Sequence, residues 1–113
     1  MLEKQAHADA FFARSANKLD FGNWGEKEKV ALSCRILASE GHSETLAGQI
    51  TVRKEDGTFL TTPLAQAFDE IDPASVIRIN ENMEVLEGPG TPNPAVRFHF
   101  WVYRQRPDVQ CII

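Results

Sequence analysis

The dipeptide Asp56-Gly57 constrains the fold of this 113-residue chain more than any other feature, because it marks a tight turn between two strand patterns. Residues 47–53 alternate apolar and polar side chains as a half-buried strand does, and residues 58–62 return as its partner before Pro63 ends the pattern. Asp-Gly is a strong hairpin signal, since both residues tolerate the backbone angles that tight turns need. The sequence therefore predicts a β-hairpin near the middle of the chain.

A helical pattern precedes this hairpin. Within residues 26–40, Val30, Cys34 and Leu37 recur at the spacing of one face of an α-helix. Acidic residues at the start suit the positive end of the helix dipole, and Gly41 is the expected left-handed stop.

A second helix is expected from Pro94 to about Arg106, capped by Asn93 and ended by Pro107. It is apolar over most of its surface, which predicts burial on more than one side. Three of its apolar residues share one face and three lie beside that face: Val96, Phe100 and Tyr103, then Phe98, Trp101 and Val102.

Residues 74–80 and 83–87 indicate a second hairpin, and the largely apolar residues 109–113 indicate the start of a buried strand. The order helix, hairpin, hairpin, helix, strand predicts an α/β layered domain with a mixed or largely antiparallel sheet. In open α/β sheets the reacting groups usually lie beyond the carboxyl ends of strands, so we expect the most informative residues to lie beyond Ile113.

Length and composition are those of one small soluble domain, which we place at residues 26–113 behind an N-terminal arm, residues 1–25. The arm shows no clean period, but it is aromatic enough that part of it is expected to pack on the domain or on a neighbouring subunit. Its aromatic residues are Phe11, Phe12, Phe21 and Trp24. The sequence shows neither a bilayer-spanning run nor the pattern of a signal peptide.

The formal net charge of −4 gives no electrostatic reason to expect nucleic acid or a membrane surface as a partner. Cys34 and Cys111 both fall at positions predicted to be buried. They could pair as a disulfide, but two reduced thiols in the cytosol are the favoured interpretation, and a cytoplasmic location follows from it.

Five segments, in this order, resemble the class II aldolase/adducin family over roughly residues 28–113. Residues 31–41 (ALSCRILASEG) resemble the family's opening helix with its glycine stop, and residues 46–53 (LAGQITVR) its A-G-N-[IV]-S-[VL]-R strand. Residues 56–63 (DGTFLTTP) resemble its D-G…[IL]-T-P hairpin. Residues 87–92 (EGPGTP) and 97–109 (RFHFWVYRQRPDV) resemble its G…P-S-S-E…H…Y…R-P-D-[VA] block.

This resemblance implies a three-layer α/β/α class II aldolase-like domain, incomplete at the C-terminus in this chain. The family includes sugar-phosphate aldolases, an epimerase, a dehydratase and the non-enzymatic adducin head. Its enzymes bind a divalent metal, usually zinc, through three histidines, and the metal acts as a Lewis acid on an enediolate-like intermediate. Two of those histidines form an H-x-H pair one step past Ile113, so no cofactor or metal ligand is expected in this chain itself.

Three departures from the family pattern bear on chemistry. Gln49 stands where the family has Asn in A-G-N, and Leu64-Ala65 stands where phosphate-binding members have Thr-Gly. The S-S-E element, whose Glu is the family's acid/base group, aligns with Asn93-Pro94-Ala95. Alanine cannot transfer a proton, and proline lacks the N–H that serine would offer an anion.

The candidate substrate-binding residues are Gly48, Gln49 and Asn93, and no catalytic residue is assigned. Gly48 and Gln49 either line a pocket or mark a strand entrance where another backbone approaches closely. Asn93 is expected to cap its helix, a role that can coexist with holding an anion at the helix start. His99 is expected to be structural, because the positions three and four residues away carry no metal ligand.

Two functional hypotheses follow, and a third qualifies them. The first is the amino-terminal part of a metal-dependent lyase, epimerase or dehydratase acting on a small hydroxy-carbonyl or sugar-phosphate compound, inactive as this chain alone. The second is a non-catalytic self-association module like the adducin head. Both predict a homo-oligomer. The third is a truncated remnant that folds poorly.

Overall fold

The structure, a computed structural model, describes residues 2–15, 23–43 and 46–113. Its elements are α1 (Leu2–Ser15), α2 (Glu26–Ser39), β1 (Thr51–Arg53), β2 (Phe59–Thr61), the 3₁₀ turn η1 (Phe68–Glu70), β3 (Ile77–Ile79), β4 (Val85–Glu87), the 3₁₀ turn η2 (Pro94–Val96), α3 (Arg97–Gln105) and β5 (Cys111–Ile112). None of the helices in the described residues is long and apolar enough to cross a membrane.

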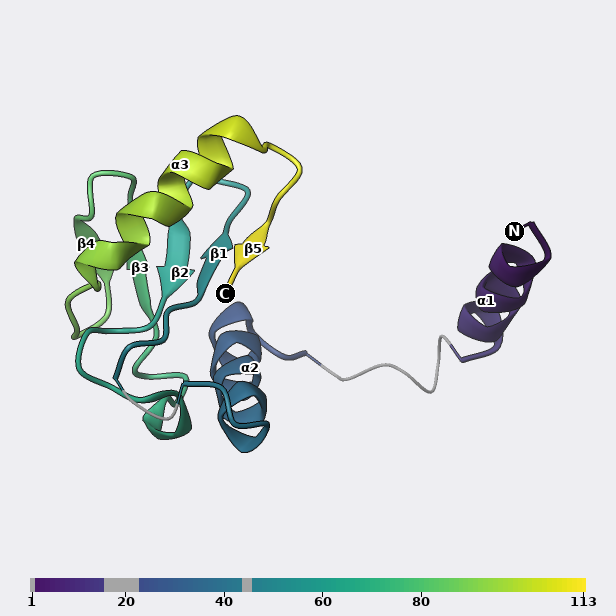
Figure 1. Ribbon diagram of the computed structural model, residues 1–113, viewed down its shortest axis with the longest axis horizontal. Coiled ribbons are helices and arrows are strands. Elements are labelled where there is room, and N and C mark those ends of the chain that lie inside the picture. The colour runs from purple at the N-terminus through teal and green to yellow at the C-terminus, as the bar shows by residue number, and fades with distance from the viewer. Residues whose placement is uncertain (1, 16–22, 44–45) are drawn as a thin grey trace.

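The described strands form one five-stranded sheet in the order β4-β3-β2-β1-β5, with every neighbouring pair antiparallel (Figure 1). Val52 pairs with Leu60 across the first hairpin and with Cys111 of β5 on its other side. Both predicted hairpins are therefore confirmed. The first strand is shorter than the pattern predicted, because residues 47–50 make no ladder and serve as a loop leading into β1.

The turn between β1 and β2 shows why Asp56-Gly57 was informative. Gly57 has a φ of +82°, which is costly for any residue with a Cβ. The Asp56 carboxylate accepts hydrogen bonds from the amide and the hydroxyl of Thr58, at 2.9 and 2.6 Å. These bonds hold the pKa of Asp56 below its ordinary value and fix the turn that sets the hairpin register.

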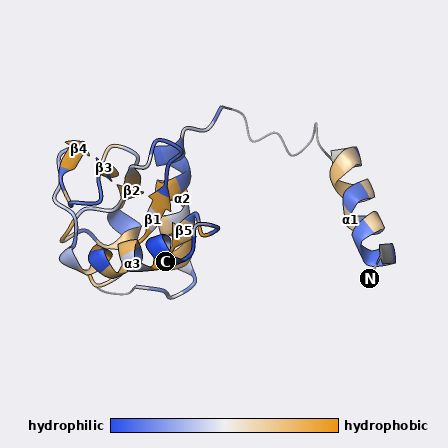
Figure 2. Cartoon of the chain, turned by 90° about the horizontal axis from the view of Figure 1, so that it is seen from above, coloured by the Kyte–Doolittle hydropathy of each residue, from blue (hydrophilic) through white to orange (hydrophobic). Residues whose placement is uncertain are grey.

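Helices cover both faces of the sheet, as the predicted three-layer class requires (Figure 2). Strand alternation separates the two cores, because neighbouring residues of β2 point to opposite faces. Leu60 packs with the inner face of α2, in a cluster that also contains Val30 and Cys34. Phe59 packs on the opposite face, and its ring centroid lies 4.7 Å from that of Phe100 in α3.

The predicted helices are confirmed, with one correction to the burial of the second. Asn93 caps η2, which runs directly into α3, and the predicted inner face of that helix is buried. The neighbouring face is not: Phe98, Trp101 and Val102 are exposed. The expectation of burial on more than one side was wrong for this chain, because only one face of α3 meets the sheet.

The last strand also differs from its prediction. β5 lies at the edge of the sheet and pairs only with β1, so it is half-covered rather than buried. Cys111 is exposed, whereas Cys34 is fully buried, and both thiols are free. Burial raises the pKa of the Cys34 thiol to about 11, which leaves it protonated and unreactive at neutral pH.

The N-terminal arm contains a helix, α1, that the sequence pattern did not predict. Phe11 and Phe12 contact each other edge to face at 5.7 Å, but both are more than half exposed, and α1 lies apart from the sheet (Figure 1). The expected packing of these two rings on their own domain is therefore not seen. Packing on a neighbouring subunit stays a prediction, and Phe21 lies outside the described residues.

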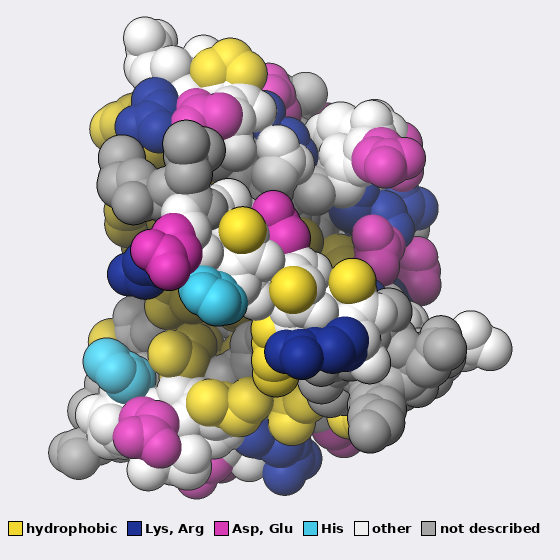
Figure 3. Space-filling model, turned by 90° about the vertical axis from the view of Figure 1, so that its right-hand side faces the viewer, with side chains coloured by type: hydrophobic (Ala, Val, Ile, Leu, Met, Phe, Trp, Pro, Cys, Tyr) yellow, Lys and Arg dark blue, Asp and Glu magenta, His cyan; other side chains and the backbone are white. Residues whose placement is uncertain are grey.

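The surface carries both signs of charge. Figure 3 shows acidic and basic side chains interspersed over one face, with apolar groups between them. Glu87 takes part in two ion pairs, one with Lys27 of α2, 60 residues away in sequence, and one with Arg78 of the neighbouring strand β3. Their partners are partly exposed, so each pair contributes little to stability, roughly 0–1 kcal/mol.

Candidate functional site

Three loops meet at the end of the sheet where β1 begins and β2 ends; they are residues 47–50, 62–64 and 91–93. Two contacts join residues 62–64 to residues 91–93: the Leu64 amide donates to the Thr91 carbonyl at 2.7 Å, and Pro63 pairs with Pro92 as an isolated antiparallel bridge. Residues 47–50 are joined to the end of β2, because Thr61 Oγ1 donates to the Ile50 carbonyl at 2.8 Å. We call these three loops the sheet-end cluster. It brings Gly48, Gln49 and Asn93, the three candidates from the sequence, to one end of the domain.

The carboxyl end of β5 reaches the same place. Thr51, the first residue of β1, pairs with Ile112, and the two strands are antiparallel. The chain direction of β5 therefore carries it towards residues 47–50 and the sheet-end cluster. The sequence analysis expected reacting groups just beyond the carboxyl ends of strands, and this end of β5 is such a position.

Gly48 sits where a side chain would collide with its surroundings. A Cβ built there would lie 2.4 Å from Ser43 Oγ and 3.0 Å from Phe68 Cζ. Of the two interpretations offered by the sequence, the close approach is directly visible, although the approaching groups are side chains rather than backbone. The absence of a side chain at Gly48 thus lets this loop lie close to Ser43 and to Phe68 of η1.

The other two candidates, Gln49 and Asn93, make hydrogen bonds within their own loops through their side-chain amides. Gln49 is half-buried, and its Nε2 donates to the Ala47 carbonyl at 2.5 Å. Asn93 Oδ1 accepts a hydrogen bond from the Ala95 amide at 2.9 Å, so its capping role is observed. A ligand that used the Gln49 amide would have to replace this local bond.

Beneath the cluster, three polar side chains share a buried network that sequence reasoning only partly anticipated. Thr51 Oγ1 lies 2.9 Å from His99 Nδ1 and 2.8 Å from Tyr103 Oη. Burial lowers the pKa of His99, so its ring is neutral at physiological pH, and burial raises the pKa of Tyr103. His99 therefore acts as a structural hydrogen-bonding residue, as expected, and Thr51 is the partner that the sequence did not reveal.

Two hollows flank the sheet-end cluster. One, of about 510 Å³, is lined by Arg35, Ser39, Ser43 and Asp69 among others, and lies next to Gly48. The other, of about 440 Å³, is lined by Pro63, Leu64 and Gln66 together with Asp72 and Gly90. Sequence reasoning missed Gln66, whose buried Oε1 has no hydrogen-bond partner among the described residues.

The carboxylates near these hollows do not form an acid/base pair. Asp69 and Glu70 are exposed, and Asp72 Oδ1 accepts hydrogen bonds from the amide and hydroxyl of Ser75, both at 2.9 Å. Those bonds hold the pKa of Asp72 below its ordinary value, so this carboxylate stays ionised. The geometry of these carboxylates is that of a solvent-exposed turn.

Within residues 2–15, 23–43 and 46–113, no three His, Cys, Asp or Glu side chains are grouped so that they could hold a metal ion. The described residues therefore do not supply the three-histidine donor set that the family resemblance implies. The polar groups of the sheet-end cluster are instead main-chain N–H and C=O groups and the Gln49 side-chain amide, and two hollows lie beside them.

The layering of helices on both faces of a sheet is the three-layer α/β/α architecture that the class II aldolase resemblance implied. Residues 28–113 match the Class II Aldolase and Adducin N-terminal domain. The chain belongs to this family.

Some of the similar proteins have the names of enzymes, and others do not. Adducin-related protein 1 of Caenorhabditis elegans is 30% identical over 94 residues, covering 78% of this chain and 13% of that protein. Decarboxylase NovR of Streptomyces niveus is 37% identical over 92 residues, covering 77% of this chain and 34% of NovR.

A solved structure, L-fuculose 1-phosphate aldolase from Glaciozyma antarctica PI12, superposes with a TM-score of 0.65 at 28% identity, covering 75% of this chain and 37% of the aldolase chain. The chain thus spans between about an eighth and two fifths of the length of these relatives.

Proposed function

We propose that this chain forms one wall of a substrate pocket in a class II aldolase-like protein that acts on a small hydroxy-carbonyl compound. The observation that carries the proposal is the convergence of the sheet-end cluster with the carboxyl end of β5, fixed by the pairing of Thr51 with Ile112. Two of the relatives bear the names of an aldolase and a decarboxylase, and both reactions cleave a carbon–carbon bond.

In this proposal the residues of the chain bind and orient, and they do not move protons. Main-chain groups of residues 47–50 and the Gln49 amide hydrogen-bond the oxygens of the substrate, and Asn93 borders the site while its Oδ1 caps η2. Pro94 has no N–H and Ala95 has no acid, so the general acid/base of the lineage is absent from this position. We expect no turnover by this chain alone, and metal-dependent cleavage of a sugar phosphate by the purified chain would contradict that.

The binding half of the proposal is tested by titrating ¹⁵N-labelled protein with dihydroxyacetone and recording amide chemical shifts. Saturable shifts are expected at Gly48, Gln49 and Leu64, and glycerol, which lacks the carbonyl, should produce much smaller ones. Gln49→Ala should weaken the effect, whereas Gln105→Ala, at an exposed site on α3, should leave it unchanged. Equal shifts with glycerol, or no change in Gln49→Ala, would contradict the proposal.

The second candidate function is non-catalytic self-association, as in the adducin head. It is favoured by the exposed apolar residues of α3, namely Phe98 and Val102, and by the exposed rings of α1. Sedimentation velocity over a range of concentrations tests it. Association that Phe98→Ser abolishes would support this function, and a monomer at every concentration would exclude it.

The expectations from the sequence about assembly, location and partners stay proposals. A homo-oligomer is expected under either function, and bound metal in a longer form of the protein would favour the catalytic one. A cytoplasmic location and the lack of nucleic-acid or membrane partners rest on the charge balance and the two free thiols. Cooperative thermal unfolding of a monodisperse sample would exclude a poorly folded remnant.

A further inference from the structure

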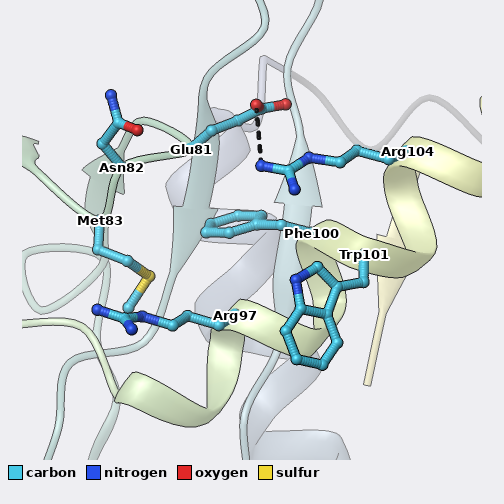
Figure 4. A pocket seen from close by; sticks show the side chains of 7 residues that line it. All are labelled: Glu81, Asn82, Met83, Arg97, Phe100, Trp101 and Arg104. Atoms are coloured by element: carbon cyan, nitrogen blue, oxygen red, sulfur yellow. Dashed lines mark ion pairs between the residues drawn. The ribbon is translucent and has the colours of Figure 1, made fainter.

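We propose that the outer side of α3 and the β3–β4 turn form a second binding site, for a small aromatic carboxylate. The two elements enclose a pocket of about 260 Å³ (Figure 4). From α3 it is lined by Arg97, Phe100, Trp101 and Arg104, and from the turn by Glu81, Asn82 and Met83. We call it the α3 pocket.

The α3 pocket shares no residue with the sheet-end cluster and lies elsewhere on the domain. Ile79, at the end of β3, pairs with Phe59, the first residue of β2. The β3–β4 turn is therefore at the end of the sheet where β2 begins, whereas the sheet-end cluster is where β2 ends. A ligand in one site would not touch the residues of the other.

One wall of the pocket is a turn held in a fixed shape. Asn80 Oδ1 accepts hydrogen bonds from the amides of Asn82 and Glu84, at 2.9 and 3.0 Å, and the Met83 amide donates to the Asn80 carbonyl at 3.0 Å. Met83 has a φ of +66°, in the left-handed region that residues with a Cβ rarely adopt. The surrounding hydrogen bonds maintain this backbone conformation, and the Met83 side chain lines the pocket.

The other wall carries an uncompensated positive charge. Arg97, Trp101 and Arg104 lie at i, i+4 and i+7, so they follow one side of α3. Arg104 is paired with Glu81 at 3.6 Å, but the guanidinium of Arg97 makes no hydrogen bond or ion pair with any described residue. Within a chain of net charge −4, the pocket therefore has one open cation at its rim.

These groups define the chemistry of the ligand. The planar fork of an arginine matches a carboxylate, which it binds through two parallel hydrogen bonds. The Trp101 ring is 64% exposed and, with the Met83 sulfur, offers an apolar surface on which a flat ring can pack, whereas Phe100, which also lines the pocket, is only 3% exposed. The volume, about 260 Å³, suits a single-ring molecule. The expected ligand is therefore a benzoate-like anion whose carboxylate contacts Arg97.

The probe for the test is benzoate, with neutral benzamide as its matched control. In ¹⁵N spectra of the whole chain, benzoate should shift the indole N–H of Trp101 in a saturable way. The indole of Trp24, the other tryptophan, should stay unchanged and serves as an internal reference. Because the contact is partly ionic, raising the salt concentration should weaken benzoate binding.

Two variants distinguish the ionic contact from nonspecific apolar binding of the probe. Arg97→Gln should weaken benzoate binding by about three- to fivefold, since an ion pair open to water contributes at most about 1 kcal/mol. Glu81→Gln should strengthen it by about twofold, because it removes a negative charge from the opposite rim. Arg14→Gln, an exposed arginine of α1, is the matched control and should bind as the wild type does.

Three results would overturn the proposal. They are the absence of saturable benzoate binding in the millimolar range, equal binding of benzamide and benzoate, and wild-type affinity in Arg97→Gln. Native circular dichroism of each variant checks that the fold is intact. Arg97 is exposed, so its replacement is not expected to unfold the domain.

Discussion

Thr51 and His99, 48 residues apart in sequence, join β1 to α3 through a buried hydrogen bond of 2.9 Å between Oγ1 and Nδ1. The bond lies on the face of the sheet that α3 covers. Tyr103 closes the network by donating to the Thr51 carbonyl at 2.9 Å. One small polar residue at the start of β1 thereby fixes the helix that carries the α3 pocket.

Replacing Thr51 should therefore cost much more than replacing an exposed threonine. Thr51→Val keeps the shape of the side chain but leaves the buried Nδ1 of His99 without its partner and Tyr103 with only the Thr51 carbonyl, which costs about 1–3 kcal/mol. Urea unfolding followed by circular dichroism measures this change. Thr91→Val, at an exposed site, is the control and should lie within about 0.5 kcal/mol of the wild type. Equal effects of the two substitutions would contradict the role given to the network.

The same network predicts how stability depends on pH. Burial lowers the pKa of His99 from its ordinary value of 6.5, so the unfolded chain binds a proton at a higher pH than the folded chain does. The free energy of unfolding should therefore fall as the pH drops below about 6.5, with no contribution from this group above that value.

Urea unfolding at pH 7.5, 6.5 and 5.5 measures this slope. His99→Gln should flatten it, whereas His42→Gln, at an exposed site, should preserve it. The shifted carboxylates titrate at lower pH and do not enter this range: they are Asp56, Asp72, Glu87 and Asp108. A slope that is unchanged in His99→Gln would contradict the prediction.

The parts of the fold that could be predicted were those encoded locally. The Asp56-Gly57 turn, the apolar stripe of α2 and the Asn93-Pro94 helix start are short-range signals, and the structure has an element at each. The exposure of Phe98 and Cys111 was not predictable in this way. Burial of a helix face or an edge strand depends on what packs against it, and sequence periodicity does not specify that partner.

The candidate site shows the same division. Family resemblance brought attention to Gly48 and Gln49, and the helix-start pattern to Asn93; all three lie in loops of the sheet-end cluster. No periodic signal pointed to Gln66, because an unpartnered buried amide becomes visible only when its surroundings are known. The α3 pocket was missed for a related reason. Its walls come from α3 and the β3–β4 turn, and no sequence motif links these two segments.

Gly48 gives a prediction about the crowding of the sheet-end cluster. Gly48→Ala should destabilise the domain by about 1–3 kcal/mol, because the new methyl group collides with Ser43 and Phe68. Removing the Ser43 side chain should relieve most of the collision. The double variant Ser43→Gly/Gly48→Ala is therefore expected to be more stable than the sum of its single variants implies. Additive effects in this double-mutant cycle would show that the two sites do not touch.

The last prediction concerns zinc. A ligand that binds only the folded state raises its stability, and the described residues present no group of donors that could hold the ion. Thermal unfolding of this chain should therefore be the same, within about 1 °C, in the presence of a small excess of zinc and of a chelator. Calcium at the same concentration controls for ionic strength. A clear rise in Tm with zinc alone, or zinc that remains with the purified chain after dialysis, would mean that its own side chains bind the metal, and the proposed division between a binding wall here and metal chemistry elsewhere would be wrong.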